Sequence, residues 1–189
     1  MLNFSGIPSE LHAPAQRYWE QFEAAILSQT LSHPRDLLPP TISVDTFFQQ
    51  LTRAFVASEF IAKTCAQRPA YLLELIESGA LFEAQTDAHL DAFTAAVNAC
   101  NTDAELDTCL RRQRQMAMIR IIWRDLNRIE GMREVTAELS RFADRVIQTT
   151  AECHYRSLEK MYGTPIGRES GIAQPFMVLG MGKLGGLEL

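Results

Sequence analysis

Residues 175–189 read Pro-Phe-Met-Val-Leu-Gly-Met-Gly-Lys-Leu-Gly-Gly-Leu-Glu-Leu, and this stretch decides the part of the fold that carries chemistry. Its first half predicts a short apolar strand over Phe176–Leu179, and its second half predicts a tight turn. Glycine tolerates positive φ and lets a backbone approach a ligand closely, because it has no Cβ. A helix that begins after such a turn offers unpaired N–H groups to a phosphate. The candidate nucleotide- or phosphate-binding residues are therefore Gly180, Gly182, Lys183, Gly185 and Gly186.

The composition is that of a globular, water-soluble protein. The chain has 189 residues, of which 47% are hydrophobic and 22% charged, enough for one sizeable domain or for one domain and the beginning of another. A formal net charge of -5 argues against a protein held to nucleic acid by a global excess of positive charge. The four cysteines include no Cys-x-x-Cys pair, so we expect reduced thiols in a reducing compartment.

The sequence shows neither a secretory signal nor a membrane-spanning segment. Its first residues, Met-Leu-Asn-Phe-Ser-Gly, lack both a basic region and a continuous apolar region. No apolar run approaches the ~20 residues that are needed to cross a bilayer. We expect a cytoplasmic protein without a membrane partner.

Apolar residues recur at helical spacing along most of the chain, which predicts a mainly α fold. Ser43 is a plausible N-cap for a helix whose buried face reaches Ile61, and Pro69 fits the first turn of a further helix. The clearest pattern begins with the capping box at residues 102–105 and ends before Gly131. The expected helices cover about 8–31, 43–61, 69–79, 90–97, 102–128 and 133–161, and a loop follows at 163–171.

The arginines between Arg111 and Arg128 are ambiguous. Arg120, Arg124 and Arg128 are spaced by four and share a helix face, which favours a solvated or salt-bridged surface. Contact with an acidic partner or with nucleotide phosphate is the alternative. Arg112 falls within the apolar stripe, where it would be a buried partner of a carboxylate.

The histidines form no metal-ligand spacing with one another, and we predict no metal ligand and no catalytic residue within these residues. His154 falls on the apolar face of its helix and is predicted to be a core or boundary residue.

From the residues alone, the glycine turn allows four interpretations. Residues 180–185 match the dinucleotide pattern G-x-G-x-x-G after a strand, but the acidic residue expected about 20 positions later falls outside the sequence. A P-loop is disfavoured because Leu184 follows Lys183 in place of Ser or Thr. The glycines could serve only a tight turn. In a nucleotidyltransferase site, the turn would hold a phosphate, Lys183 would add a point charge, and carboxylates on following strands would hold Mg²⁺.

The residues between the glycines favour the last interpretation. The string at 179–189 resembles the signature G-M-G-K-L-G-G-x-E-L of the glutamine synthetase adenylyltransferase/adenylyl-removing enzymes, which continues as N-x-x-S-D-x-D. Residues 110–126 are similar to the family's L-R-R-x-R…R-I…D-L helix, and the region from Phe60 to Leu75 resembles its early helices. The resemblance covers about residues 43–189.

The resemblance implies a fold and an activity. It implies a helical body followed by the first strand and Gly-rich turn of a truncated DNA polymerase β-like nucleotidyltransferase domain. In the family, one half removes AMP from a glutamine synthetase tyrosine by phosphorolysis, releasing ADP, and the other half adds AMP from ATP. The present sequence looks like the N-terminal part of the removing half. Gly185 and Gly186 would cradle the phosphates, Gly180 and Gly182 would shape the turn, and Lys183 would contact phosphate.

The resemblance also implies partners and a domain layout. Mg²⁺ ligands are expected beyond residue 189, so these residues alone would be inactive. Adenylylated glutamine synthetase and a PII-type signal protein would be partners. We predict an N-terminal helix and Pro-rich linker at 1–40, a helical region at 41–162, a loop at 163–174 and the start of the nucleotidyltransferase domain at 175–189. The rival hypotheses are a helical interaction module with a structural glycine turn, and the start of a dinucleotide-binding domain.

Overall fold

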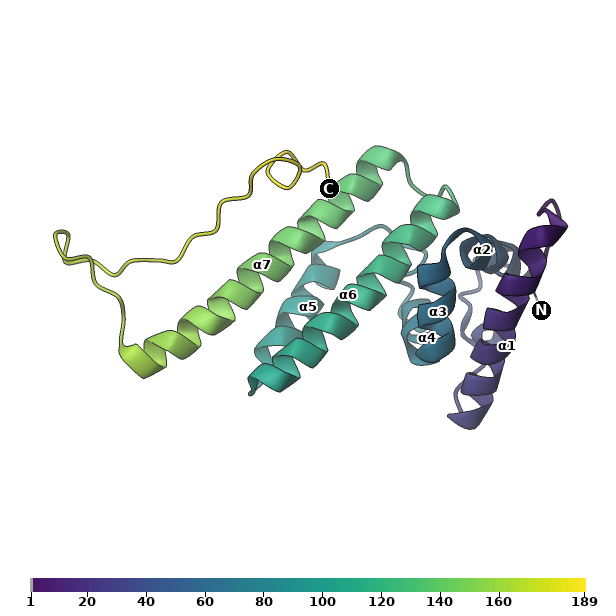
Figure 1. Cartoon of the computed structure of the whole chain (residues 1–189), viewed down its shortest axis with the longest axis horizontal. Helices are drawn as coiled ribbons and strands as arrows, with labels where there is room; N and C mark the ends of the chain where they lie inside the picture. The colour runs from purple at the N-terminus through teal and green to yellow at the C-terminus, as the bar shows by residue number, and fades with distance from the viewer. Residues whose placement is uncertain (1) are drawn as a thin grey trace. The chain divides into compact units, whose positions relative to one another are not determined.

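The computed structural model describes residues 2–189, and Figure 1 shows that these residues are mainly helical. The mainly α prediction is confirmed. No helix among these residues is both long and apolar enough to cross a membrane. The α-helices are α1 (His12–Ser28), α2 (Val44–Ala57), α3 (Glu59–Gln67), α4 (Pro69–Glu77), α5 (Asp87–Asn98), α6 (Asp103–Leu126) and α7 (Met132–Tyr162), and two 3-10 helices are η1 (Ser9–Leu11) and η2 (Pro34–Leu37).

Side-chain caps set the helix boundaries in the first half of the chain. The hydroxyl of Ser43 accepts a hydrogen bond from the Thr46 amide at 3.1 Å and starts α2. The single helix expected from Ser43 to Ile61 is in fact two helices. Ser58 has an extended backbone (φ -135°, ψ 103°), and its hydroxyl accepts from the Ile61 amide at 3.3 Å, so it ends α2 and caps α3.

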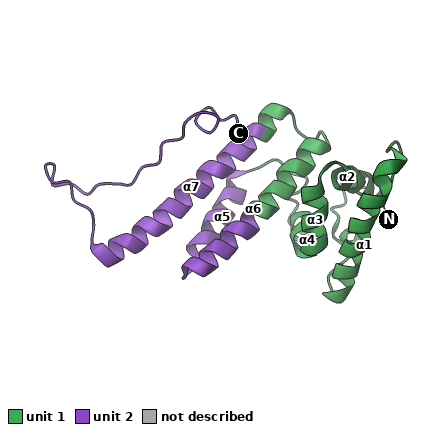
Figure 2. Ribbon diagram, viewed as in Figure 1, with its two compact units in different colours: residues 1–85, 114–135 green, residues 86–113, 136–189 purple. Residues whose placement is uncertain are grey.

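The chain divides into two compact units, drawn in separate colours in Figure 2. Unit 1 contains the residues up to Gln85 together with 114–135, and unit 2 contains 86–113 and 136–189. Besides the division after Gln85, the chain is divided at 135/136, near the start of α7, and at 113/114, inside α6. The first half of this helix therefore belongs to unit 2 and its second half to unit 1.

Unit 1 is organised around buried aromatic side chains. Trp123 of α6 stacks on Phe47 of α2 with ring centroids 5.6 Å apart, and Trp19 of α1 meets Phe48 edge-on at 5.6 Å. All four side chains are buried. Near the start of the chain, the amide of Asn3 donates to the hydroxyl of Thr52 at 2.7 Å, and Thr52 has no exposed surface.

Unit 2 has a smaller apolar core with polar contacts around it. Phe93 of α5 packs edge-on against Phe142 of α7 at 5.7 Å. The guanidinium of Arg145 donates at 3.1 Å both to a carboxylate oxygen of Asp91 and to the hydroxyl of Thr94. The ring contact and these hydrogen bonds join α7 to α5.

The expected strand at Phe176–Leu179 is not formed. Within residues 2–189, β-pairing is limited to an isolated antiparallel bridge between Ile166 and Ala173, and the segment after α7 runs without regular structure (Figure 1). Phe176, Met177 and Leu179 are exposed. A strand needs a neighbouring backbone for its N–H and C=O groups, and the described residues provide none for this segment.

Replacing Phe47 with alanine is expected to destabilise unit 1 by about 3–5 kcal/mol, because it removes a fully buried ring from the stack on Trp123. Both tryptophans, Trp19 and Trp123, belong to unit 1, so urea denaturation followed by tryptophan fluorescence measures this unit. Leu27→Ala is the control, since Leu27 is 80% exposed, and it should change the free energy of unfolding by less than about 0.5 kcal/mol. Equal effects of the two substitutions would contradict the assigned core.

Candidate functional site

The glycine-rich segment forms a compact turn from Gly182 to Leu187. Three backbone hydrogen bonds close it: Gly186 donates to Gly182 at 2.9 Å, Leu187 to Leu184 at 3.1 Å and Glu188 to Lys183 at 2.8 Å. Gly182 has a φ of +62°, in the left-handed region that favours glycine. The glycine at this position therefore has a conformational reason, whatever the turn binds.

Gly185 is required for a different reason, which is close packing of the backbone. A Cβ placed on Gly185 would lie 2.6 Å from the carbonyl oxygen of Gly180, closer than real Cβ contacts allow. At Gly186 the nearest atom to such a Cβ is the Gly182 oxygen at 3.4 Å, which is close to ordinary contact. The turn thus brings the backbones of Gly180 and Gly185 together.

Three consecutive amides of the turn make no hydrogen bond in the described part of the chain. Within residues 2–189, the N–H groups of Lys183, Leu184 and Gly185 have no hydrogen-bond acceptor. The candidate residues Gly180, Gly182, Lys183, Gly185 and Gly186 are all exposed. Consecutive N–H groups beside a left-handed residue are a common anion-binding arrangement. The structure therefore places Gly182, Lys183, Gly185 and Gly186 in one turn, and Gly180 packs against that turn at Gly185.

The segment that carries the turn contacts α7 within unit 2. The hydroxyl of Tyr155 donates to the carbonyl of Gln174 at 2.8 Å, and the amide of Leu189 donates to the hydroxyl of the buried Ser140 at 3.2 Å. Between these two contacts lies an open groove of about 700 Å³. It adjoins the turn at Gly180 and Leu184, and its other walls are Asp144, Ile147, Gln148, Ala151, Glu152, Tyr155, Arg156 and residues 175–178.

Two arginines of α6 are buried in unit 1, which corrects the predicted solvated face. Arg120 is 5% exposed, and its Nε and Nη2 atoms donate to the carbonyl oxygens of Ala80 and Glu83, both at 2.6 Å. Burial, and then the neighbouring charge of Arg124, lower the pKa of Arg120 to about 10. The guanidinium is still charged at neutral pH. It therefore acts as a buried cation that holds two backbone carbonyls after α4.

Arg124 is 2% exposed and pairs with the carboxylate of Glu130 at 2.5 Å. Its Nε and Nη1 atoms are buried without a hydrogen-bond partner in residues 2–189. The salt-bridged alternative predicted for this face therefore holds at Arg124. Arg128, the third arginine of the series, is exposed and has a φ of +53°, because α6 has already ended. Arg112 is half-buried rather than fully buried.

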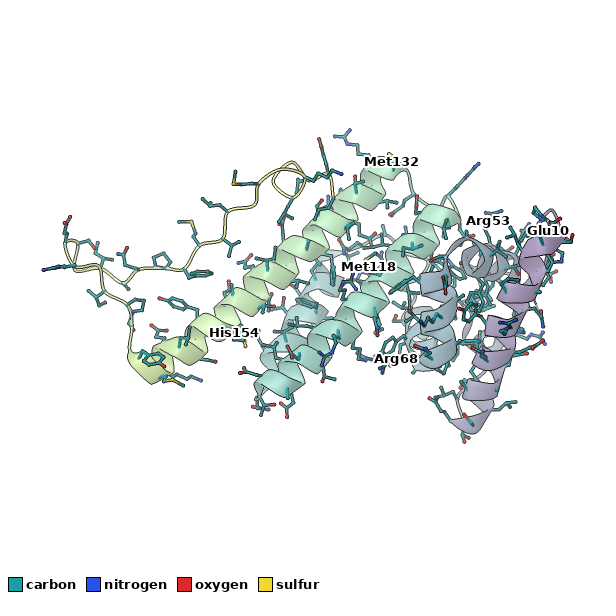
Figure 3. The ribbon with its side chains drawn as sticks, viewed as in Figure 1. Glu10, Arg53, Arg68, Met118, Met132 and His154 are labelled. Carbon is teal, nitrogen blue, oxygen red and sulfur yellow. The ribbon has the colours of Figure 1, made fainter. Side chains whose placement is uncertain are left out.

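His154 lies on α7 (Figure 3), and its side chain is exposed rather than in the core or at its boundary. Helical angle placed it on the apolar face, but this end of α7 has few neighbours, and Leu158 and Met161 are exposed beside it. Among residues 2–189, no group of three or more His, Cys, Asp or Glu side chains is arranged to hold a metal ion.

Comparison with known proteins identifies the family. The model of the glutamate-ammonia ligase adenylyltransferase family matches residues 48–189, which include α6, α7 and the whole glycine turn. The chain belongs to this family. The prediction drawn from the string at 179–189 is therefore confirmed, and the enzymes of the family are nucleotidyltransferases.

Individual relatives carry the same similarity. Bifunctional glutamine synthetase adenylyltransferase/adenylyl-removing enzymes are 39% identical over 153 residues in Nitrosococcus oceani and 40% identical over 142 residues in Pseudomonas aeruginosa, covering 78% and 75% of this chain. The enzyme of Pseudomonas putida is 35% identical over 97% of the chain, so similarity extends into the first helices as well. The chain spans 14–19% of the length of these relatives.

Arg120→Ala is expected to destabilise unit 1 by about 3–5 kcal/mol, because the carbonyls of Ala80 and Glu83 lose their charged donor. Arg114→Ala is the matched control on the same helix, since Arg114 is exposed and lies in the same unit. It should cost less than about 0.5 kcal/mol. Urea denaturation followed by tryptophan fluorescence measures both, and an Arg120→Ala protein as stable as Arg114→Ala would contradict the buried role.

Gly185→Ala is expected to open the turn, because its Cβ would clash with the Gly180 carbonyl at 2.6 Å. Gly186→Ala should leave the turn in place, since its closest contact is 3.4 Å. The amide chemical shifts of residues 182–188 in ¹H–¹⁵N NMR spectra report the difference. Similar small shifts in both variants would show that the turn is not packed in this way.

Proposed function

We propose that the turn at residues 180–186 binds nucleotide or inorganic phosphate in a glutamine synthetase adenylyltransferase/adenylyl-removing enzyme. The observation that carries the proposal is the row of three consecutive amides, at Lys183, Leu184 and Gly185, that donate no hydrogen bond within residues 2–189. Such amides are donors for phosphate oxygens, and the ammonium group of Lys183 adds positive charge without fixed geometry. Gly182 and Gly185 give the backbone its shape, and Gly186 closes the turn by donating to Gly182.

The proposed reaction is removal of AMP from an adenylylated tyrosine of glutamine synthetase. An oxygen of orthophosphate attacks the phosphorus of the AMP group, the bond from phosphorus to the tyrosine oxygen breaks, and ADP leaves while the phenol regains a proton. The amides of the turn would neutralise charge on the phosphate oxygens as it develops. The complementary half of the family's enzymes uses ATP as the AMP donor, and we assign the present residues to the removing half.

Mg²⁺ would neutralise charge on the transferred group during this displacement. The present residues contain no Asp-x-Asp pair, and residues 2–189 offer no cluster of metal-binding side chains. We therefore propose that the carboxylate ligands of Mg²⁺ lie outside these residues. The 189 residues alone would be inactive for this reason.

The same proposal explains why the apolar segment at 176–179 is exposed. Phe176, Met177, Val178 and Leu179 are each at least 50% exposed. We propose that they become the first strand of the nucleotidyltransferase domain once neighbouring strands pair with them, with the domain beginning at residue 175. The helical region at 41–162 and the loop at 163–174 would precede it. A cytoplasmic location and regulation by a PII-type protein belong to the same proposal.

Lys183→Ala in the protein expressed from its complete gene is expected to lower the rate of phosphorolysis by about 10- to 100-fold, because one charged phosphate contact is lost. The assay follows ADP release from adenylylated glutamine synthetase in the presence of phosphate and Mg²⁺. Lys160→Ala is the matched control, since Lys160 is an exposed lysine in the last turn of α7. An unchanged rate in Lys183→Ala would contradict the phosphate contact.

Two further results test the wider assignment. The 189-residue chain should release no ADP in the same assay, and activity from it would contradict the proposed need for carboxylates outside these residues. Reading the gene beyond codon 189 should show an Asp-x-Asp pair shortly after the turn. Its absence would favour a helical interaction module.

A further inference from the structure

A histidine ring caps the 3-10 helix η2. His33 stands just before this helix with an extended backbone (φ -72°, ψ 142°), and its Nδ1 atom accepts a hydrogen bond from the Arg35 amide at 3.2 Å. A backbone N–H can only donate, so Nδ1 carries no proton, and the neutral ring carries its hydrogen on Nε2. A proton on Nδ1 would place two donors against each other, and the cap would be lost.

The same ring lies in a cluster of aromatic side chains within unit 1. It meets Trp19 of α1 edge-on and Phe48 of α2 at a tilt, with ring centroids 6.2 Å apart in both pairs. Trp19 and Phe48 are buried, and His33 is half-buried between them. These rings take the place of water that would otherwise solvate a positive charge on the imidazole. The aromatic contacts therefore favour the neutral ring, as the hydrogen bond does.

The charges around the ring leave this preference in place. Partial burial, and then the guanidinium of Arg35, lower the pKa of His33. Asp36 of η2 and Glu23 of α1 act in the opposite direction, and the amino terminus acts in the same direction as Arg35. From α2 the ring meets the uncharged Phe48.

The direction of this shift fixes the direction of the pH dependence. Because the pKa of His33 is lower in the folded chain than the value of about 6.5 in an unfolded one, folding favours the neutral ring. The stability that the ring contributes is fully present above about pH 6.5 and is lost as the pH falls through the folded pKa.

The cap holds a segment that is packed on unit 1. η2 lies in the connection between α1 and α2 and contacts α4. Its first residue, Pro34, is buried, and Leu37 and Leu38 pack in part against the core. Loss of the cap would therefore loosen this connection where it lies on the core.

We propose that His33 is an acid-sensitive cap, whose protonation releases the Arg35 amide, weakens η2 and lowers the stability of unit 1. The ring takes up one proton from solvent at Nδ1, and the hydrogen bond from the Arg35 amide breaks. Removal of that proton restores the cap, so the change is reversible. It gives the connection between α1 and α2 a response to mild acid that needs no ligand.

NMR titration of the protein tests the cap directly. The Cε1–H signal of the His33 ring should titrate with a midpoint below about 6.5, the value of an unperturbed histidine. The amide signal of Arg35 should move with the same midpoint, because this amide loses its acceptor. A ring midpoint at or above about 6.5, or an Arg35 amide that does not follow the ring, would overturn the proposal.

Urea denaturation at about pH 7.5 and about pH 5.5 measures the effect on unit 1, since both tryptophans belong to it. In His33→Asn the amide oxygen still caps η2 but does not titrate. Between the two pH values, the equilibrium constant for unfolding should rise about 3- to 10-fold more in the wild type than in His33→Asn.

His154→Asn is the matched control, since His154 is exposed and lies in unit 2, and it should keep the wild-type pH dependence. The same pH dependence in His33→Asn and the wild type, or its loss in His154→Asn, would contradict the assigned role. If His33→Asn does not fold, the NMR titration of the wild type decides.

Discussion

The burial of the second half of α6 is the constraint on which unit 1 depends. One face of this half places Trp123 against Phe47, and a neighbouring face places Arg120 against the carbonyls of Ala80 and Glu83. The helix thus supplies both an apolar contact and a charged hydrogen-bond donor to the same unit. A charged guanidinium is costly to bury, and it is tolerated here because two of its nitrogens are satisfied by backbone oxygens.

Local features were the most predictable from sequence. The N-cap at Ser43, the proline at the start of α4 and the helical periods of α6 and α7 follow from short-range rules, and the structure has helices there. The break at Ser58 was missed because a serine inside an apolar period reads equally well as a surface position. Its cap becomes visible only through the extended backbone of that residue.

Features that depend on distant residues were less predictable. Spacing by four correctly placed Arg120 and Arg124 on one face, but only the fold shows that this face is covered. The carbonyls that accept from Arg120 lie about forty residues earlier in the chain, and no local pattern marks them. The prediction for His154 was wrong for the opposite reason, since an apolar stripe shows which face of a helix is apolar but not whether anything packs on that face.

For the candidate site, the sequence predicted the residues of the turn. The amides without an acceptor and the contact between Gly180 and Gly185 could be found only in the structure.

Two hydroxyls with no exposed surface hold the backbone near either end of these 189 residues, Thr52 at Asn3 and Ser140 at Leu189. A purification tag or a label attached directly beside Asn3 or Leu189 would strain the hydrogen bond at that residue. A flexible spacer between the tag and the chain would remove that strain. The loop at 163–171 is a better place for a probe, since most of its residues are exposed.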